Sequence, residues 1–183
     1  MKIRIQDLEF RKLEFELQFQ PGEIDFGADV RQAGLLETSG HAELIREHHG
    51  GHESIDDIRL VGKLDGRIEV NCARCLEPVE IAISREFDLL YRPLESEKGS
   101  DEIAIHEAET EIGYYSGEGM DLEDSLREQI LLAVPIKTLC RYDCRGLCAS
   151  CGANRNEQLC DCNQNKPDPR WAALGELKNK LLQ

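Results

Sequence analysis

Six of the eight cysteines in this chain lie between Cys140 and Cys162. Cys148 and Cys151 form a C-x-x-C that is followed directly by Gly152, the spacing of a zinc knuckle, in which a tight turn aims backbone N–H groups at two thiolates. Glycine gives such a turn the backbone freedom it needs. Four thiolates complete the tetrahedral shell of Zn²⁺ and leave no open position for chemistry. The spacing therefore predicts a closed, structural zinc site at Cys148, Cys151, Cys160 and Cys162.

The remaining four cysteines allow a second site. Cys72 and Cys75 form another C-x-x-C, which needs two more ligands to close a tetrahedron. Cys140 and Cys144 are the spare pair, so we predict one or two structural zinc ions, the second held by Cys72, Cys75, Cys140 and Cys144. The alternative partition leaves Cys72 and Cys75 free and gives Cys140 or Cys144 to the first ion.

Disulfides are the main alternative to metal at these cysteines. The N-terminal residues carry charges but no apolar stretch, so no secretory signal is expected. A reducing cytosol favours metal ligands over disulfides. We therefore expect a cytoplasmic protein that uses its cysteines to bind metal.

An enzymatic alternative assigns Cys72 and Cys75 to a thiol–disulfide redox pair, with Arg74 lowering the pKa of one thiol. Against this alternative, the motif is expected at a hairpin turn and not at the helix N-terminus where such thiols are activated. The sequence contains no Gly-rich phosphate loop, no G-x-S-x-G elbow and no convincing pair of catalytic carboxylates. We therefore expect no enzyme and no small-molecule substrate.

Charge is distributed unevenly along the chain, whose formal net charge is −14. Residues 1–136 carry 14 basic and 31 acidic side chains, whereas residues 137–170 carry six basic and four acidic ones. Such an acidic molecule is poorly suited to bind nucleic acid over a broad surface. The charge serves solubility or attracts a basic partner such as a ribosomal protein. No apolar run approaches the length of a membrane helix, about 20 residues.

Alternating apolar residues predict most of the strands. We expect one half-buried strand in residues 2–19, a turn at Pro21-Gly22, and a second strand at residues 36–46. Asp65-Gly66 between two alternating runs predicts a hairpin turn that separates strands at residues 58–64 and 68–72. A further strand should begin at Val79.

Three other segments are expected to be loops. They are residues 23–34, residues 47–52 with their three histidines, and the acidic, Gly-punctuated residues 107–119. The irregular spacing of the histidines favours a polar hairpin loop over a metal site.

The period changes to that of a helix at Asp121, an expected N-cap, and Pro135 should end this helix. A last helix should start at Asp168-Pro169 and pack back on the body through Trp171. We therefore predict an α+β fold in which an antiparallel sheet of hairpins is covered by a helix. The expected domains are residues 1–136 and the Cys-rich, zinc-binding residues 137–183.

Residues 60–180 resemble a known family. The segments that carry the resemblance are Cys72-Ala-Arg-Cys75-Leu76-Glu77-Pro78, the run from Glu128 to Pro135 that leads into residues 139–162, and Asp168-Pro-Arg170 with Leu174 and Leu177. They are similar to the YceD family, the large ribosomal RNA subunit accumulation proteins. The resemblance implies a non-enzymatic bacterial protein of the cytoplasm that supports accumulation or processing of 23S ribosomal RNA.

The resemblance also suggests a partner for the cysteine-rich segment. A ribosomal RNA or a ribosomal protein of the large subunit is the expected partner. Arg141, Arg145 and Arg155 are the candidate contacts, because guanidinium groups suit phosphate. The alternative for each arginine is a solvated charge in a loop.

Overall fold

The computed structural model describes residues 1–49, 53–94, 112–162 and 170. The chain divides into two compact units. The first unit contains residues 1–71 and 78–138, and the second joins residues 72–77 to the chain from Leu139 onward. Residues 72–77 are thus an insertion in the sequence of the first unit. The predicted division into domains 1–136 and 137–183 stays a proposal.

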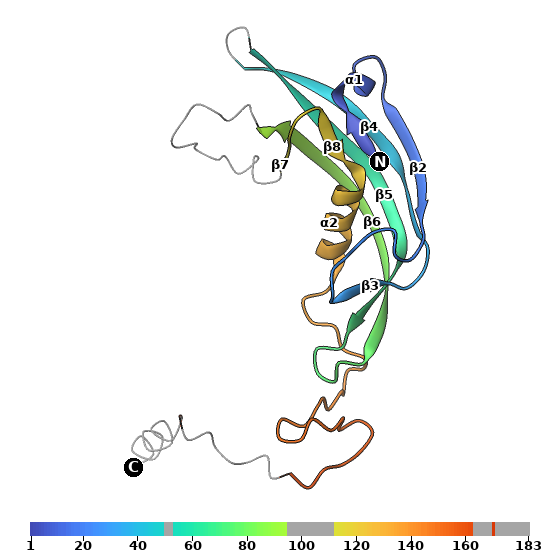
Figure 1. Ribbon diagram of the computed structural model, residues 1–183, viewed down its shortest axis with the longest axis vertical. Coiled ribbons are helices and arrows are strands. Elements are labelled where there is room, and N and C mark those ends of the chain that lie inside the picture. The colour runs from blue at the N-terminus through green and yellow to red at the C-terminus, as the bar shows by residue number, and fades with distance from the viewer. Residues whose placement is uncertain (50–52, 95–111, 163–169, 171–183) are drawn as a thin grey trace. The chain divides into compact units, whose positions relative to one another are not determined.

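The first unit is built on one long, curved sheet (Figure 1). Its elements are β1 (Lys2–Arg4), α1 (Ile5–Leu8), β2 (Leu13–Phe19), β3 (Val30–Gln32), β4 (Leu36–His49), β5 (Glu53–Asn71), β6 (Pro78–Pro93), β7 (Ile112–Tyr115), β8 (Gly119–Asp121) and α2 (Leu122–Ala133). The main sheet has the order β2-β4-β5-β6-β7, and β3 also pairs with β5. β1 and β8 form a separate two-stranded sheet.

The main sheet is mixed, which corrects the prediction of a purely antiparallel sheet. β2, β3, β4, β5 and β6 pair antiparallel with their neighbours, but β7 runs parallel to β6, with Leu90 opposite Ile112. A parallel pair needs a connection of about a dozen residues or more, and the chain between Pro93 and Ile112 is long enough to provide one. The α+β class itself is confirmed, because two helices accompany a mostly antiparallel sheet.

The hairpin turn predicted at Asp65-Gly66 is wrong, because β5 continues through both residues. Asp65 pairs with Glu37 on one side and with Ser84 on the other, so the strand is central at this point. Gly66 is a glycine for a different reason: a Cβ there would lie 2.1 Å from the Leu36 side chain. The glycine therefore permits a close approach of strands and does not form a turn.

Other local predictions also need correction. Residues 2–19 are not one strand, because α1 interrupts them, and part of the expected loop at residues 23–34 forms β3. The described part of residues 107–119 forms β7 and the start of β8, which residues 116–118 connect, and is not one long loop. For β3, β7 and β8, pairing with a distant strand, such as Ile3 with Met120, outweighs a weak local signal. At the histidine-rich turn β4 extends to His49 and β5 starts at Glu53.

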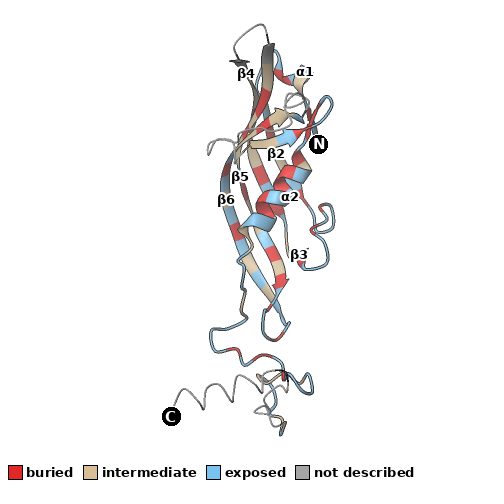
Figure 2. Ribbon diagram, turned by 90° about the vertical axis from the view of Figure 1, so that its left-hand side faces the viewer, coloured by how far each residue is buried: buried red, intermediate tan, exposed pale blue. Residues whose placement is uncertain are grey.

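Helix α2 covers one face of the sheet, as predicted (Figures 1 and 2). Its N-cap Asp121 accepts a hydrogen bond from the backbone N–H of Glu123, and the helix ends at Ala133, before Pro135. Its apolar stripe is fully buried and consists of Leu122, Leu126 and Ile130. Polar bonds reinforce the contact with β6, since the Tyr91 hydroxyl donates to Ser125 Oγ at 2.9 Å.

Two predicted features fall outside the described residues. These are the helix that was expected to start at Asp168-Pro169, with Trp171, Leu174 and Leu177, and the loop tip at residues 50–52. Among the described residues, no helix is both long enough and apolar enough to span a membrane.

Candidate metal centres

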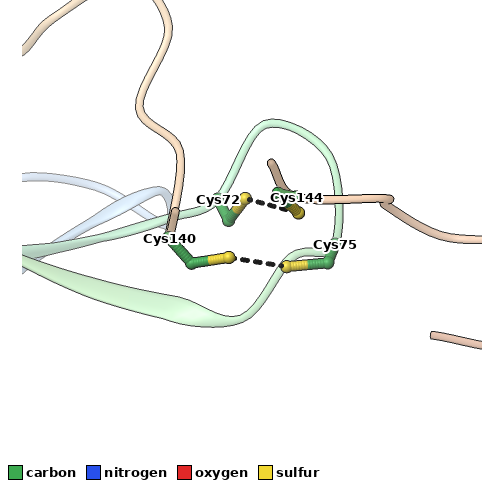
Figure 3. A group of neighbouring side chains, drawn as sticks. All are labelled: Cys72, Cys75, Cys140 and Cys144. Carbon is green, nitrogen blue, oxygen red and sulfur yellow. Dashed lines mark hydrogen bonds between the residues drawn. The ribbon is translucent and has the colours of Figure 1, made fainter. Parts of the chain in front are cut away.

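The structure gathers the eight cysteines into two groups of four, both within the second unit. In the first group Cys72 faces Cys144 with their sulfurs 3.8 Å apart, and Cys75 faces Cys140 at 3.5 Å (Figure 3). All four sulfurs lie within 4.8 Å of one another. A tetrahedral zinc ion with Zn–S bonds of about 2.3 Å requires sulfurs about 3.8 Å apart. The first group could therefore hold such an ion.

The second group consists of Cys148, Cys151, Cys160 and Cys162, whose sulfurs also lie within 4.8 Å of one another. Cys148 is buried, Cys151 is exposed and the other two are half-buried. None of the eight cysteines, all of which lie in the described residues, forms a disulfide. The separations of 3.5 and 3.8 Å in the first group far exceed a disulfide bond of about 2.0 Å. Each group could therefore hold one metal ion.

The two C-x-x-C motifs adopt the same turn. The backbone N–H of Leu76 donates to the Cys72 carbonyl at 3.0 Å, and that of Gly152 donates to the Cys148 carbonyl at 2.8 Å. In both motifs the residue after the second cysteine is left-handed, with φ of 63° at Leu76 and 75° at Gly152. This turn closes the β5–β6 hairpin at residues 72–77, which confirms the predicted position of the first motif.

Backbone N–H groups point at the sulfurs of each motif. Burial would raise the pKa of the Cys72 thiol, but the N–H groups of Arg74, Cys140 and Cys75 hold that pKa at about 6. In the second group the N–H groups of Cys151 and Ser150 lower the pKa of Cys148 to about 6. Hydrogen bonds to sulfur stabilise the thiolate, which is the form that binds metal.

One exposed or half-buried cysteine in each group has a pKa shifted in the opposite direction. Burial, together with the neighbouring thiols, raises the pKa of Cys140 to about 12. The thiols of Cys151 and Cys148 raise the pKa of Cys162 to about 12. Four sulfurs at this distance cannot all carry a negative charge without a cation between them. A divalent ion removes that penalty, so the groups fit a metal ion.

A network of polar bonds surrounds Cys144. Burial opposes ionisation of this thiol, but the Asn156 side chain and the Gly146 N–H donate to its sulfur and lower its pKa. Arg74 Nη1 donates to the Cys144 carbonyl at 2.7 Å, and the Leu147 N–H donates to the Arg74 carbonyl at 2.9 Å. These contacts connect the turn at residues 72–77 with residues 144–147.

The candidate arginines occupy different surroundings. Arg141 is exposed, pairs with Asp143 at 3.4 Å and donates to Asn156 at 2.8 Å. Arg145 is exposed, whereas Arg155 is half-buried. The structure thus leaves Arg145 most open to a partner, while Arg141 already has two contacts.

Asn156 was not among the site residues predicted from the sequence, but it contacts the first cysteine group. Its amide, in the loop from Cys151 to Cys160, donates to the Cys144 sulfur of the first group at 3.3 Å. The only signal was its place behind the second C-x-x-C, and that spacing does not show which sulfur the amide reaches.

The redox alternative for Cys72 and Cys75 finds little support in this geometry. Their sulfurs pair across the group, with Cys144 and Cys140, at 3.8 and 3.5 Å. Both residues lie in a turn between two strands and not at a helix N-terminus. The arrangement favours a four-ligand metal site over a two-cysteine redox centre.

Comparisons with known proteins cover the residues of both cysteine groups. A family model described as large ribosomal RNA subunit accumulation protein YceD matches residues 60–178, a range that includes both cysteine groups. An uncharacterized protein of Mycobacterium tuberculosis is 34% identical over 155 residues, which cover 81% of this chain. The same match covers 64% of that protein, so the chain spans less than two thirds of its length.

A plant protein shows a shorter similarity. The large ribosomal RNA subunit accumulation protein YCED homolog 1, chloroplastic, of Arabidopsis thaliana is 33% identical over 64 residues, or 35% of this chain and 20% of that protein. The homolog of the same name in Zea mays is 28% identical over 128 residues, or 57% of this chain and 44% of that protein. No solved structure is significantly similar to the chain. The match over residues 60–178 shows that the chain belongs to the YceD family.

Proposed function

We propose that this protein is a non-catalytic factor that supports accumulation and processing of 23S ribosomal RNA during assembly of the large ribosomal subunit in the bacterial cytoplasm. The observation that carries the proposal is the family match, which spans both cysteine groups. A four-thiolate site leaves no open position on the metal, so its role is structural. The protein needs no small-molecule substrate for this role.

Zinc is the metal that the ligand set favours. Soft thiolates in a tetrahedral array select zinc or iron–sulfur centres. The sulfur separations of 3.5 and 3.8 Å in the first group suit a single small ion at its centre, and the sulfurs of the second group likewise lie within 4.8 Å of one another. When bound, zinc would crosslink residues 72–77 to residues 140–144 and would close the loop from residue 148 to residue 162. The chain itself supplies the N–H groups that hold the sulfurs in place.

Charge favours a basic protein as the direct partner. The described part of the second unit contains five arginines and four acidic residues: Arg74, Arg141, Arg145, Arg155 and Arg170 against Glu77, Asp143, Glu157 and Asp161. Each zinc ion with four thiolates adds a formal charge of −2, so the loaded unit is acidic. Such a unit does not attract phosphate at long range. A basic ribosomal protein of the large subunit, in contrast, is attracted to it electrostatically. The three candidate arginines would then make local contacts to ribosomal RNA.

The proposal is tested in a bacterium that carries this gene. The tagged protein is isolated from lysate, and co-purifying ribosomal proteins and precursor 23S RNA are measured beside a deletion strain. We expect large-subunit components with the tagged protein and reduced 23S RNA without it. A double variant with Cys140→Ser and Cys151→Ser serves as the metal-free control. Unaltered 23S RNA in the deletion strain, together with no ribosomal component in the isolate, would refute the proposal.

A further inference from the structure

One loop connects the two cysteine groups. The loop runs from Cys151 to Cys160, which are both ligands of the second group, but its hydrogen bonds reach the ligand segment of the first. The Arg155 N–H donates to the Gly146 carbonyl at 2.9 Å. The loop therefore begins and ends at ligands of the second group, while its hydrogen bonds contact the segment that carries ligands of the first group.

The Asn156 side chain makes the most direct of these contacts. Its Nδ2 donates to Cys144 Sγ at 3.3 Å and to Asn154 Oδ1 at 2.9 Å. Its Oδ1 accepts from the Arg145 backbone N–H at 2.8 Å and from Arg141 Nη2 at 2.8 Å. A carboxamide has two N–H donors and two acceptor lone pairs, so its hydrogen-bonding capacity is filled. A flipped amide would oppose donors to donors, so the contacts fix which atom faces the sulfur.

We propose that Asn156 couples the two groups, so that a metal ion in either group raises the affinity of the other. This inference rests on the proposed function for its two metal sites. A metal ion in the second group fixes the loop from Cys151 to Cys160 and with it the Asn156 amide. The first group then closes around its ion with the donor to Cys144 already in place, and no loop freedom is lost at that step.

The direction of this effect follows from linkage. Because coupling between two binding equilibria is reciprocal, an ion in the first group must help the second by the same factor. The donor itself matters because groups that hydrogen-bond to metal ligands tune the site, and their removal typically costs about 10–100-fold in metal affinity. Asn156 thus acts as a positioning residue for a ligand that belongs to the other group.

The test uses the full chain, stripped of metal and titrated with Co²⁺, whose thiolate charge-transfer absorption reports tetrahedral sulfur sites. Cys151→Ser disables the second group and Cys140→Ser disables the first, and both residues are exposed. We expect Cys151→Ser to weaken the first site by a factor of about 5–150, the usual range of coupling between sites. Cys140→Ser should weaken the second site by the same factor.

Variants of Asn156 then test whether this side chain is responsible for the coupling between the two sites. Asn156→Ala should weaken the first site by about 10–100-fold and make each affinity independent of the other site. Asn156→Asp keeps the acceptors for Arg141 and Arg145 but turns an oxygen toward the Cys144 sulfur, so it should weaken the site at least as much. Gln158→Ala is the matched control, since Gln158 is exposed in the same loop and its side chain takes no part in this network.

Several results would overturn the inference. Affinities that are equal in the intact chain and in the single-site variants would show that the groups are independent. Coupling that persists in Asn156→Ala, or wild-type affinity in Asn156→Asp, would show that another contact carries it. A chain that binds no Co²⁺ at either group would instead overturn the metal sites of the proposed function as well. Far-UV circular dichroism verifies that the sheet is intact in every variant.

Discussion

At the scale of single residues, the residue after each C-x-x-C adopts a left-handed backbone conformation that few amino acids favour. Leu76 and Gly152 occupy the same place in their turns, with φ of 63° and 75°. Glycine adopts this region freely, whereas a residue with a Cβ pays roughly 1–2 kcal/mol there. The turn aims N–H groups at the sulfurs, and its shape is kept in the first motif although leucine is strained in it.

This strain leads to a prediction for the first site. Leu76→Gly should tighten metal binding at the first group by about fivefold, since roughly 1 kcal/mol of strain is relieved in the closed turn. Gly152→Ala should weaken the second group by a similar factor. Competition with a chromophoric chelator measures both affinities. Ala73→Gly is the control, because it loosens the same turn at a residue without positive φ; equal weakening by Leu76→Gly and Ala73→Gly would contradict the prediction.

At the scale of elements, an ion pair joins the two longest strands. Arg92 on β6 lies 2.9 Å from Asp57 on β5, and the two side chains are 11% and 0% exposed. Two nitrogens of the Arg92 guanidinium contact the carboxylate, because Nε also donates to Asp57 at 3.3 Å. A buried carboxylate depends on its partner, because removal of that partner leaves an uncompensated charge.

Arg92→Ala should therefore lower the free energy of unfolding of the first unit by about 3–5 kcal/mol, the usual cost of breaking a buried pair. Urea denaturation followed by circular dichroism measures the change. Arg59→Ala is the matched control on β5, because Arg59 pairs with Asp88 at 2.6 Å but both side chains are about half exposed. The Arg59 variant should change stability far less. Equal losses in the two variants would show that burial does not set the strength of these pairs.

A row of residues across the sheet explains two further glycines. Phe15, Gly40, Gly62 and Phe87 face one another on β2, β4, β5 and β6. A Cβ on Gly40 would lie 2.9 Å from the Phe15 ring, and one on Gly62 would lie 2.8 Å from the Phe87 ring. The two phenylalanines thus fill the space that the glycines leave, and the missing side chains let the large rings pack against the sheet.

At the scale of the whole molecule, metal content decides between the two partitions of the cysteines. We expect two zinc ions per chain in freshly purified, reduced protein, with one lost in Cys72→Ser and the other lost in Cys148→Ser. Each change removes a ligand from a different group of four. Inductively coupled plasma mass spectrometry gives the stoichiometry, and circular dichroism should show that the sheet stays folded in Cys148→Ser.

One zinc ion per chain, together with rapid alkylation of Cys72 and Cys75, would refute this partition. Insulin reduction that survives chelation and disappears in Cys72→Ser would favour the redox alternative instead.

Much of this molecule could be predicted from local sequence. Helix α2 was predicted from its apolar stripe, its Asp121 cap and Pro135, and the alternation of residues 36–46 predicted β4. These features depend on neighbours a few residues apart, which set both helix and strand periodicity. The second unit is similar in this respect, because a C-x-x-C fixes the distance between its own two thiolates whatever surrounds it.

Tertiary structure decided the features that depend on distant segments. Asp65-Gly66 is a turn signal by itself, but pairing with both β4 and β6 keeps it in a strand. The parallel β7 also follows from long-range pairing that no local pattern encodes. The contact of Asn156 with Cys144 follows from how two loops fold against each other. The sequence by itself thus determined the two C-x-x-C motifs and the turns around them, because these depend on short spacings. Only the fold decided which distant residues meet, because their pairing is set by packing and hydrogen bonds summed over the whole chain.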